Sequence, residues 1–406
     1  MMAGIKEIIS SCADRMDSFY LYDERRILGT IPYLKNNFPQ VDFLYSIKCN
    51  PNASILRSVF SQGLGADAAS VGEVELASGS GLPGNRIYFS APGKSTKDIE
   101  RVLGHCTLIA DSIDEIRRIQ DVCSRMEKSV CIGIRINPDF SFSGDSGAAS
   151  KFGIDEEEAF AFLRNASCRN VKVTGIHVHL KSQELNAGVL AAYYDKVLCL
   201  AEKFASVCGE PDFVNMGSGM GIPGAASDSA LDLLQLQKLS QSSLNRFRER
   251  HPGTKIIIET GRYVVGECGY YVTKVMDRKV SHEKTYLILK NTLNGFIRPS
   301  LARLVEKYSP ELNPSGTEPL FTSVDAFRFL TLKEDAAAEK VTLVGNLCTA
   351  ADIVAEDIML PHLECGDVVI MTNAGSYAAV LSPMQFSSQE RPSELFLSES
   401  GQIIGG

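Results

Sequence analysis

The stretch Phe43-Leu44-Tyr45-Ser46-Ile47-Lys48-Cys49-Asn50 is an apolar, strand-like run that closes on a single lysine. A lysine at the end of a buried strand is costly unless its amine is neutral or paired. A buried lysine with a lowered pKa is the usual way for a protein to form a Schiff base. The alternative is a strand-end lysine whose amine reaches water, and this stretch taken alone favours that alternative.

The same pattern recurs along the first two-thirds of the chain: a short apolar run, a polar or Gly-rich turn, then a stretch with helical spacing. Eight such units predict an α/β fold, a closed (β/α)8 TIM barrel, with an open doubly wound sheet as the alternative. The helical stretches include 113–126, 156–164, 187–207 and 230–250. The expected strands lie near residues 43–48, 65–69, 87–91, 107–111, 130–137, 173–180, 213–218 and 255–260.

After about residue 265 the pattern changes to strand-like runs with few helical stretches between them. This change predicts a second, mostly antiparallel β domain, shaped as a sandwich or barrel, to which the early run 18–22 adds a strand. We expect a barrel domain over 23–265 and a C-terminal β domain over 266–406 together with 1–22. The later strands are expected at 270–280, 285–291, 340–346 and 368–373.

Composition narrows the class of protein. The net charge of −8 argues against a nucleic-acid partner. The first twenty residues carry five charges and no long apolar core, and no apolar run approaches a membrane span, so we expect neither a signal peptide nor a membrane partner. Eleven scattered cysteines without a CxxC pair suit a reducing compartment with no disulfide framework and no metal site. We therefore expect a cytoplasmic protein.

Polar residues gather at the predicted C-terminal ends of the strands, where barrel enzymes build their sites. Each has an ordinary explanation when it stands alone. Asp67 and Asp111 suit helix N-caps, His179 suits a satisfied half-buried histidine, and Arg135 suits an ion pair with a neighbouring carboxylate. As a set on one rim they are hard to explain by structure alone. The set comprises Lys48, Asp67, Ser90, Asp111, Arg135, His179, Ser182, Gly217, Ser218, Gly219, Glu259 and Arg262.

Two of these segments suggest a particular chemistry. Met216–Gly221 follows a strand, and the backbone NH groups of its GxGxG turn are able to approach a phosphate, although a Gly-rich turn is often only a turn. The spacing is not the GxGxxG of a dinucleotide fold. Glu259 ends a strand, and a carboxylate there suits a protonated pyridine nitrogen, while Arg262 suits a phosphate. An ordinary ion pair at a helix start is the alternative for Glu259 and Arg262.

Taken together, these segments resemble the fold-type III pyridoxal-phosphate (PLP) decarboxylases, which include the ornithine, arginine and diaminopimelate decarboxylases. The resemblance runs from about Phe19 to Phe386. The barrel segments that carry it are Tyr45-Ser46-Ile47-Lys48-Cys49-Asn50, Gly65-Ala66-Asp67-Ala68-Ala69-Ser70 with Gly72-Glu73, Ala91-Pro92-Gly93-Lys94, Ser150-Lys151-Phe152-Gly153 and His177-Val178-His179-Leu180-Lys181-Ser182-Gln183.

The second domain carries three further matches. Gly345-Asn346-Leu347-Cys348 resembles the catalytic-cysteine segment, Gly375-Ser376-Tyr377 the phosphate-binding tyrosine motif, and Arg298-Pro299 the start of a substrate-binding stretch. In the family the cysteine reaches the partner subunit's site, so the resemblance implies a homodimer with shared active sites.

The resemblance also implies a role for each matching residue. The expected catalytic residues are Lys48, Cys348, Glu259 and His179. The expected PLP-binding residues are Lys48, Asp67, Arg135, His179, Ser182, Gly217, Ser218, Gly219, Glu259, Arg262 and Tyr377. The expected substrate-binding residues are Arg298, Thr349, Asp352 and Lys181.

Departures from the family pattern bear on the substrate. Relatives that act on ornithine or diaminopimelate place an acidic residue directly after the cysteine, and Thr349 stands there instead. Ala302 replaces a tyrosine, and Lys181 replaces a glycine. A buried ammonium without its carboxylate loses several kcal/mol. The variant resembles the branch that decarboxylates modified amino acids, such as the siderophore intermediate citryl-diaminopropionate or carrier-bound glutamate.

Three alternatives remain open from the sequence. One is a decarboxylase of a free diamino acid such as diaminopimelate, ornithine or lysine. Another is an alanine-racemase-like enzyme, although such racemases set an arginine rather than a glutamate against the pyridine nitrogen. The last is a non-catalytic PLP carrier, usually a barrel alone, which the second domain with Cys348 and Tyr377 disfavours.

Overall fold

The computed structural model describes residues 2–165, 169–309, 322–333 and 336–405, and the chain forms two compact units. The barrel unit holds residues 30–221 and 230–261. The β unit holds residues 1–29, 222–229 and 262–406. The barrel unit begins at residue 30 and ends at residue 261, where 23 and 265 were expected, and the return of 222–229 to the β unit has no signal in the sequence.

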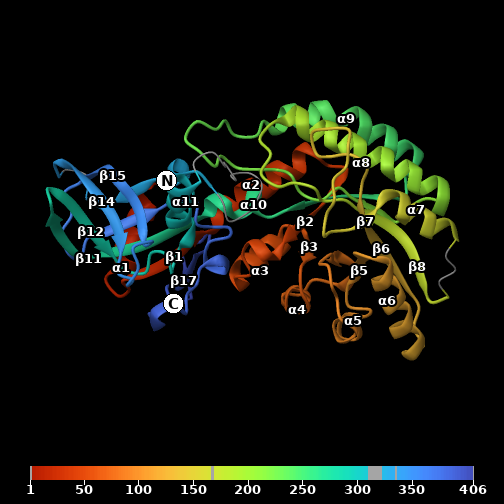
Figure 1. Cartoon of the computed structure of the whole chain (residues 1–406), viewed down its shortest axis with the longest axis horizontal. Coiled ribbons are helices and arrows are strands. Elements are labelled where there is room, and N and C mark those ends of the chain that lie inside the picture. Colours follow the sequence, from red (N-terminus) through yellow and green to blue (C-terminus); the bar gives the residue numbers. More distant parts are fainter. Residues whose placement is uncertain (1, 166–168, 310–321, 334–335, 406) are drawn as a thin grey trace. The chain divides into compact units, whose positions relative to one another are not determined.

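The barrel unit is built on eight parallel strands that close on themselves (Figure 1). Strand β5 pairs with β6 and β10 pairs with β2, which completes the circle. Because the strands close into a circle, the predicted TIM barrel is confirmed and the open doubly wound sheet is excluded. A short strand, β7 (Ile154–Asp155), extends β6 outside the circle. The barrel strands are β2 (Val41–Ser46), β3 (Gly65–Ala68), β4 (Ile87–Phe89), β5 (Thr107–Ala110), β6 (Val130–Asn137), β8 (Val171–His177), β9 (Phe213–Asn215) and β10 (Lys255–Thr260).

Large side chains fill the barrel interior, so it is a packed core and not a pore. Tyr88 and Phe213 meet edge to face with ring centroids 5.1 Å apart, and Leu44, Ile109 and Ile257 pack around them. A glycine is needed opposite the Phe213 ring, because a Cβ atom on Gly175 would lie 2.4 Å from it.

Helices surround the barrel, and α8 and α9 lie side by side on its outside (Figure 1). Ser70 caps α4 and Ser112 caps α6. The alternative explanation of Asp67 and Asp111 as helix N-caps is therefore wrong. The helices are α2 (Glu24–Asn37), α3 (Ala53–Ser61), α4 (Val71–Gly79), α5 (Thr96–Val102), α6 (Ile113–Arg125), α7 (Glu156–Asn165), α8 (Ala187–Cys208) and α9 (Leu233–Arg250).

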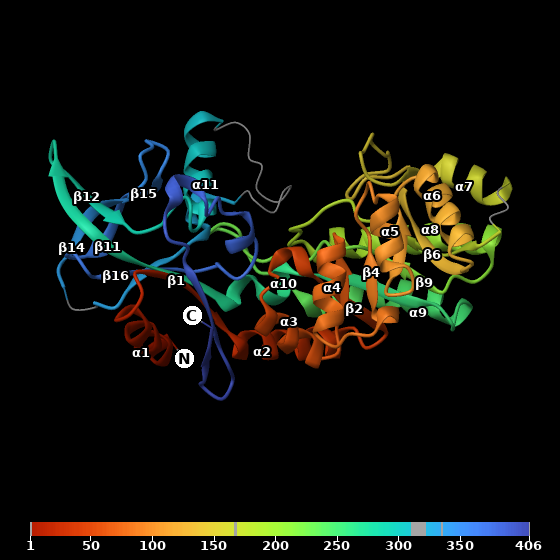
Figure 2. The same ribbon diagram turned by 90° about the horizontal axis from the view of Figure 1, so that it is seen from below.

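The β unit is a mixed sheet in which antiparallel pairs predominate, joined through the long strand β11. Two pairings, β1 with β17 and β12 with β14, are parallel. Helix α1 (Met2–Ala13), which the sequence did not predict, covers one face with Ile5 and Ile9 (Figure 2). The strands are β1 (Ser18–Asp23), β11 (Gly269–Ser281), β12 (Lys284–Leu289), β13 (Phe329–Thr331), β14 (Ala338–Gly345), β15 (Ile353–Pro361), β16 (Val368–Met371), β17 (Ser393–Leu397) and β18 (Ile403–Ile404), with helices α10 (Arg262–Val265) and α11 (Ile297–Tyr308).

Across the described part of the chain, we find no helix with the length and apolar character that a bilayer crossing requires.

Candidate active site

The C-terminal ends of β2, β3 and β4 meet at Asp67, which is only 1% exposed. Its carboxylate accepts hydrogen bonds from Ser46 Oγ and Ser90 Oγ, both at 2.8 Å. Lys48 Nζ lies 3.4 Å from Asp67 Oδ2. The structure therefore brings together Lys48, Asp67 and Ser90 from the predicted rim.

Lys48 sits in a single 3-10 turn directly after β2, and its side chain is 41% exposed. The Asp67 carboxylate raises the pKa of Lys48 above its ordinary value, more than burial lowers it. The expectation of a buried lysine with a lowered pKa is therefore wrong for the cofactor-free protein. The amine is a paired ammonium, and it must give up a proton before it can attack a carbonyl carbon.

His179 lies just beyond β8, and its Nδ1 accepts a hydrogen bond from the Ser218 backbone NH at 3.0 Å. Burial lowers the pKa of His179 to about 3, although Glu259 opposes this effect. The ring is therefore neutral near pH 7 and carries its hydrogen on Nε2. Arg135 Nη2 donates to the His179 carbonyl oxygen at 3.0 Å, and its guanidinium lies 4.4 Å from the Phe152 ring centroid.

The Gly-rich turn after β9 depends on its glycines. Gly217 has a φ of 66° and Gly219 has a φ of 140°, values that favour glycine. A Cβ atom on Gly217 would lie 2.4 Å from the Val178 carbonyl oxygen. On the other side, Glu184 N donates to Gly219 O at 2.7 Å. The turn is held from both sides, and it brings Ser218 next to His179.

Glu259 is the penultimate residue of β10 and is 2% exposed, and the sequence did not identify Asn215 or His177 as its partners. Asn215 Nδ2 donates to Glu259 Oε1 at 2.9 Å, and His177 Nε2 lies 3.1 Å from the same oxygen. Burial alone raises the pKa of Glu259, but His177, with a smaller effect from the Lys48 ammonium, holds it below its ordinary value. The carboxylate is therefore ionised near pH 7, as a partner for a protonated ring nitrogen must be.

The β unit contains a second group of expected residues. The Arg262 guanidinium lies 5.2 Å from the Tyr377 ring centroid. Arg298 Nη1 donates to the Ser376 carbonyl oxygen at 3.0 Å. Burial and the neighbouring Arg262 guanidinium lower the pKa of Arg298 to about 9. Two buried guanidiniums, one of which lowers the pKa of the other, are suited to an anion.

Ser376 and Arg298 keep part of their hydrogen-bonding capacity free. Ser376 Oγ and Arg298 Nε are buried without a hydrogen-bond partner among the described residues. The loop is seated tightly, because a Cβ atom on Gly375 would lie 1.7 Å from the Val265 carbonyl oxygen. These free donors point to a ligand with acceptor oxygens.

Cys348 is exposed on the loop between β14 and β15. Asp352, expected to bind substrate, has its carboxylate directed into that loop. It accepts hydrogen bonds from Thr292 Oγ1 at 2.5 Å, from Leu293 N at 2.9 Å and from Leu347 N at 3.2 Å. Substrate binding by Asp352 stays a prediction, and the observed contacts give it a role in shaping the cysteine loop.

Three other expected residues have simple surroundings. Thr349 Oγ1 accepts a hydrogen bond from Ala351 N at 3.2 Å. Lys181 Nζ pairs with Glu184 Oε2 at 3.0 Å and is partly exposed. Ser182 follows it in the same half-buried turn.

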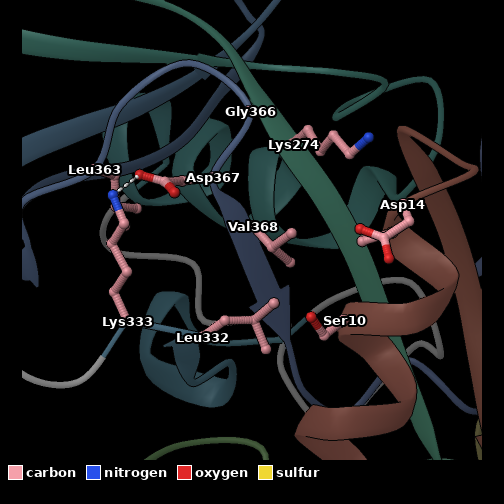
Figure 3. Close-up of a pocket in the computed structure, with 10 residues that line it drawn as sticks. Ser10, Asp14, Lys274, Leu332, Lys333, Leu363, Gly366, Asp367 and Val368 are labelled. Atoms are coloured by element: carbon pink, nitrogen blue, oxygen red, sulfur yellow. Dashed lines mark hydrogen bonds and ion pairs between the residues drawn. The ribbon is translucent and has the colours of Figure 1, made fainter.

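A separate cavity of about 310 Å³ lies in the β unit, next to α1, β11 and β16 (Figure 3). Its two lysines are already paired, Lys333 with Asp367 at 2.5 Å and Lys274 with Asp17 at 2.9 Å. The lining residues are Ser10, Ala13, Asp14, Lys274, Leu332, Lys333, Leu363, Gly366, Asp367 and Val368. None of them is among the expected site residues.

Known proteins resemble this chain over nearly its whole length. L-glutamyl-[BtrI acyl-carrier protein] decarboxylase of Niallia circulans is 30% identical over 93% of this chain and 88% of its own. Diaminopimelate decarboxylase of Archaeoglobus fulgidus is 30% identical over 90% of this chain and 84% of its own. The crystal structure of diaminopimelate decarboxylase from Helicobacter pylori complexed with L-lysine superposes with a TM-score of 0.81 at 26% identity, covering 96% of this chain and 93% of that one.

Residues 25–266 match the family described as pyridoxal-dependent decarboxylase, pyridoxal binding domain. That match spans more than half of the chain, and the curated relatives extend it through the β unit. The chain therefore belongs to the PLP-dependent amino acid decarboxylases.

Proposed function

We propose that this decarboxylase acts on an α-amino acid whose side chain is modified so that it lacks a distal ammonium, such as a siderophore intermediate or a carrier-linked glutamyl group. The relative from Niallia circulans is named for a carrier-bound glutamyl substrate. Other relatives are named diaminopimelate decarboxylases. A free diamino acid is therefore the second candidate.

One observation carries the proposal: the cysteine loop offers no unengaged carboxylate for a distal ammonium. Asp352 is the only acidic residue between Gly345 and Ile353. Both of its oxygens already accept hydrogen bonds from its own unit. Thr349, at the position where diamine-specific relatives carry an acid, contributes only a hydroxyl. A free diamino acid would leave its ammonium without a countercharge, which is unfavourable in a desolvated site.

The residues present fit PLP. Lys48 supplies the amine, and the ionised Glu259 suits the pyridine nitrogen. Within the barrel unit, the Gly217–Gly219 turn offers backbone NH groups suited to a phosphate. Within the β unit, Arg262 and Tyr377 offer a guanidinium and a hydroxyl suited to an anion. When bound, the cofactor supplies an electron sink for the pair left behind by the departing carboxyl group.

We assign each protein group one task in that reaction. Asp67 holds the Lys48 amine at the strand end, and that amine would bind the cofactor aldehyde. The neutral His179 ring would contact the cofactor without adding charge. Glu259 keeps the ring nitrogen protonated. Cys348 Sγ donates the proton that replaces the carboxyl group at Cα.

The surroundings of Cys348 favour a homodimer with shared active sites. Its thiol is exposed, and Ser387 Oγ lies 3.8 Å from its sulfur. The neighbouring segment exposes Val380, Leu381 and Phe386, with Phe386 44% exposed. An exposed thiol beside several exposed apolar side chains suits a surface that a second copy covers.

The substrate proposal is tested by CO2 release across a panel of free diamino acids, their N-acylated forms and carrier-linked glutamate. We expect an acylated or carrier-linked substrate to have the highest kcat/KM. Thr349→Glu should raise kcat/KM for free lysine or ornithine by roughly tenfold, which is the effect of about 1.4 kcal/mol. Thr349→Gln is the matched control, because it has nearly the same size and no charge. A wild-type preference for a free diamino acid would overturn the substrate proposal.

The shared site is tested by mixing two inactive variants, Lys48→Ala and Cys348→Ala. Random exchange makes half of the dimers hybrids, and each hybrid has one intact site, so recovery should approach about a quarter of wild-type activity. Absence of recovery after verified subunit exchange would place each site within one chain.

A further inference from the structure

His177 is the last residue of β8 and is only 1% exposed. Its Nε2 lies 3.1 Å from Glu259 Oε1, which is an ion-pair distance. Neither ring nitrogen, however, makes a hydrogen bond of good geometry to any described residue. An unsatisfied buried polar group costs about 1–3 kcal/mol. A leucine or phenylalanine at this position would avoid that cost, so stability alone does not explain the histidine.

A second polar side chain, Asn215, contacts Glu259 next to His177. Asn215 Nδ2 donates to Glu259 Oε1 at 2.9 Å, and Asn215 Oδ1 accepts from Gly217 N at 2.9 Å. The Gly217 NH fixes the orientation of the amide, because only the oxygen of Asn215 can accept from it. The backbone of the Gly-rich turn is thereby connected to the carboxylate. Both His177 and Asn215 act on the same oxygen, Oε1.

The second oxygen, Glu259 Oε2, is left for a ligand. Its nearest ring nitrogen is His179 Nδ1, at 3.9 Å. That nitrogen already accepts a hydrogen bond from the Ser218 NH, so it has no hydrogen to donate to Oε2. The carboxylate is therefore held through one oxygen and presents the other.

We propose that His177 is a positioning residue for Glu259: together with Asn215 it holds Oε1, so that Oε2 remains ionised and oriented toward the ring nitrogen of the cofactor. This inference rests on the proposed function. His177 itself touches neither substrate nor cofactor in this assignment and acts only through Glu259.

The groups around Glu259 make the activity of a His177 variant depend on pH in a specific way. Burial raises the pKa of this carboxyl group, and His177 is the largest opposing influence. Removing the imidazole should therefore raise the pKa of Glu259 and shift the acidic limb of the activity profile to higher pH. The titratable and charged groups that face Glu259 from the surrounding elements are His177, His179, Lys48, Arg135 and Tyr193.

The test compares His177→Leu with His177→Gln, whose side-chain amide can place an NH near the position of Nε2. We expect His177→Leu to lower kcat by roughly tenfold or more with little change in KM, and to move the acidic limb upward. His177→Gln should keep most of the wild-type rate. His251→Gln is the matched control, because His251 Nε2 pairs with Glu202 Oε2 at 3.0 Å on the same unit, outside the site.

A measurement that needs no turnover separates positioning from packing. Urea unfolding of the cofactor-free proteins at several pH values should show that the stability deficit of His177→Leu grows as the pH rises, because the ionised Glu259 carboxylate then lacks one compensating neighbour. The pH titration of the bound-cofactor absorbance should shift in His177→Leu and stay unchanged in His251→Gln. A less stable His177→Leu with wild-type kcat and an unshifted titration would make His177 a packing residue.

Where His177→Leu does not fold, His177→Gln and His177→Asn decide between the two roles. The shorter asparagine cannot reach Oε1, so only the glutamine variant should retain the wild-type titration. Equal behaviour of the two variants would overturn the assignment. Failure of the proposed function gives a different result. A wild-type protein that releases no CO2 from any amino acid would refute the function, whatever the His177 variants do.

Discussion

Asp352→Asn is the change for which the structure gives the clearest magnitude. The carboxylate accepts hydrogen bonds from Thr292 Oγ1, Leu293 N and Leu347 N. Hydrogen bonds to a charged group contribute about 1.5–3 kcal/mol and neutral ones about 0.5–1.5 kcal/mol. Asparagine keeps one acceptor oxygen, so two bonds become weaker. The third donor faces an NH2 group, which costs about 1–3 kcal/mol.

An amide is cheaper to bury than a carboxylate, and this offsets part of the loss. We therefore expect Asp352→Asn to lower the free energy of unfolding by about 2–4 kcal/mol, as measured by urea unfolding at pH 7. The loosened loop should also lower kcat through Cys348, with little change in cofactor affinity. Equilibrium dialysis measures that affinity.

Asp357→Asn is the matched control. Asp357 is exposed on β15 with a φ of 53°, a conformation that asparagine tolerates, so its stability change should stay under about 0.5 kcal/mol. A raised KM with unchanged stability in Asp352→Asn would refute the positioning role and support substrate binding. Unchanged stability and unchanged kinetics would refute both roles.

Three further outcomes are expected. Lys48→Ala should abolish the covalent attachment of cofactor that borohydride fixes in wild type; a labelled peptide elsewhere would move the assignment. Glu259→Gln should lower turnover by about two to three decades, the effect of about 2–4 kcal/mol, while cofactor affinity changes little; near-wild-type turnover would exclude this role. The pKa of His179 falls on folding to about 3, so its contribution to stability is complete above its unfolded pKa of about 6.5 and is lost as the pH falls toward 3. Urea unfolding should show roughly 2 kcal/mol less stability at pH 5 than at pH 7, and His179→Gln should lose less over the same range.

The barrel was predictable because each strand is a continuous apolar run bounded by turn residues. The β unit was harder to predict. Strand β15 carries Glu356 and Asp357 in its centre, and its pairing with β14 is irregular, so it lacks a clean alternation of apolar and polar residues. Helix α11 begins with Ile297-Arg298-Pro299, and its Arg-Pro pair resembles a substrate motif more than the first turn of a helix. Proline in that turn is favourable, because its missing NH would have no helical partner there.

For the site, the sequence indicates which residues take part, but it does not indicate which residues they contact. Asp352 was identified by its place after Cys348, but the hydroxyl that binds it, on Thr292, lies 60 residues away in the chain. Asn215 stands two residues before Gly217, where its spacing indicates nothing, because its partner Glu259 is 44 residues away. Local spacing carries information about what one element presents, such as the glycines of a turn. It carries no information about the distant residue that the element contacts in the folded chain. Those contacts decide whether a carboxylate holds a loop, as Asp352 does, or keeps an oxygen for a ligand, as Glu259 does.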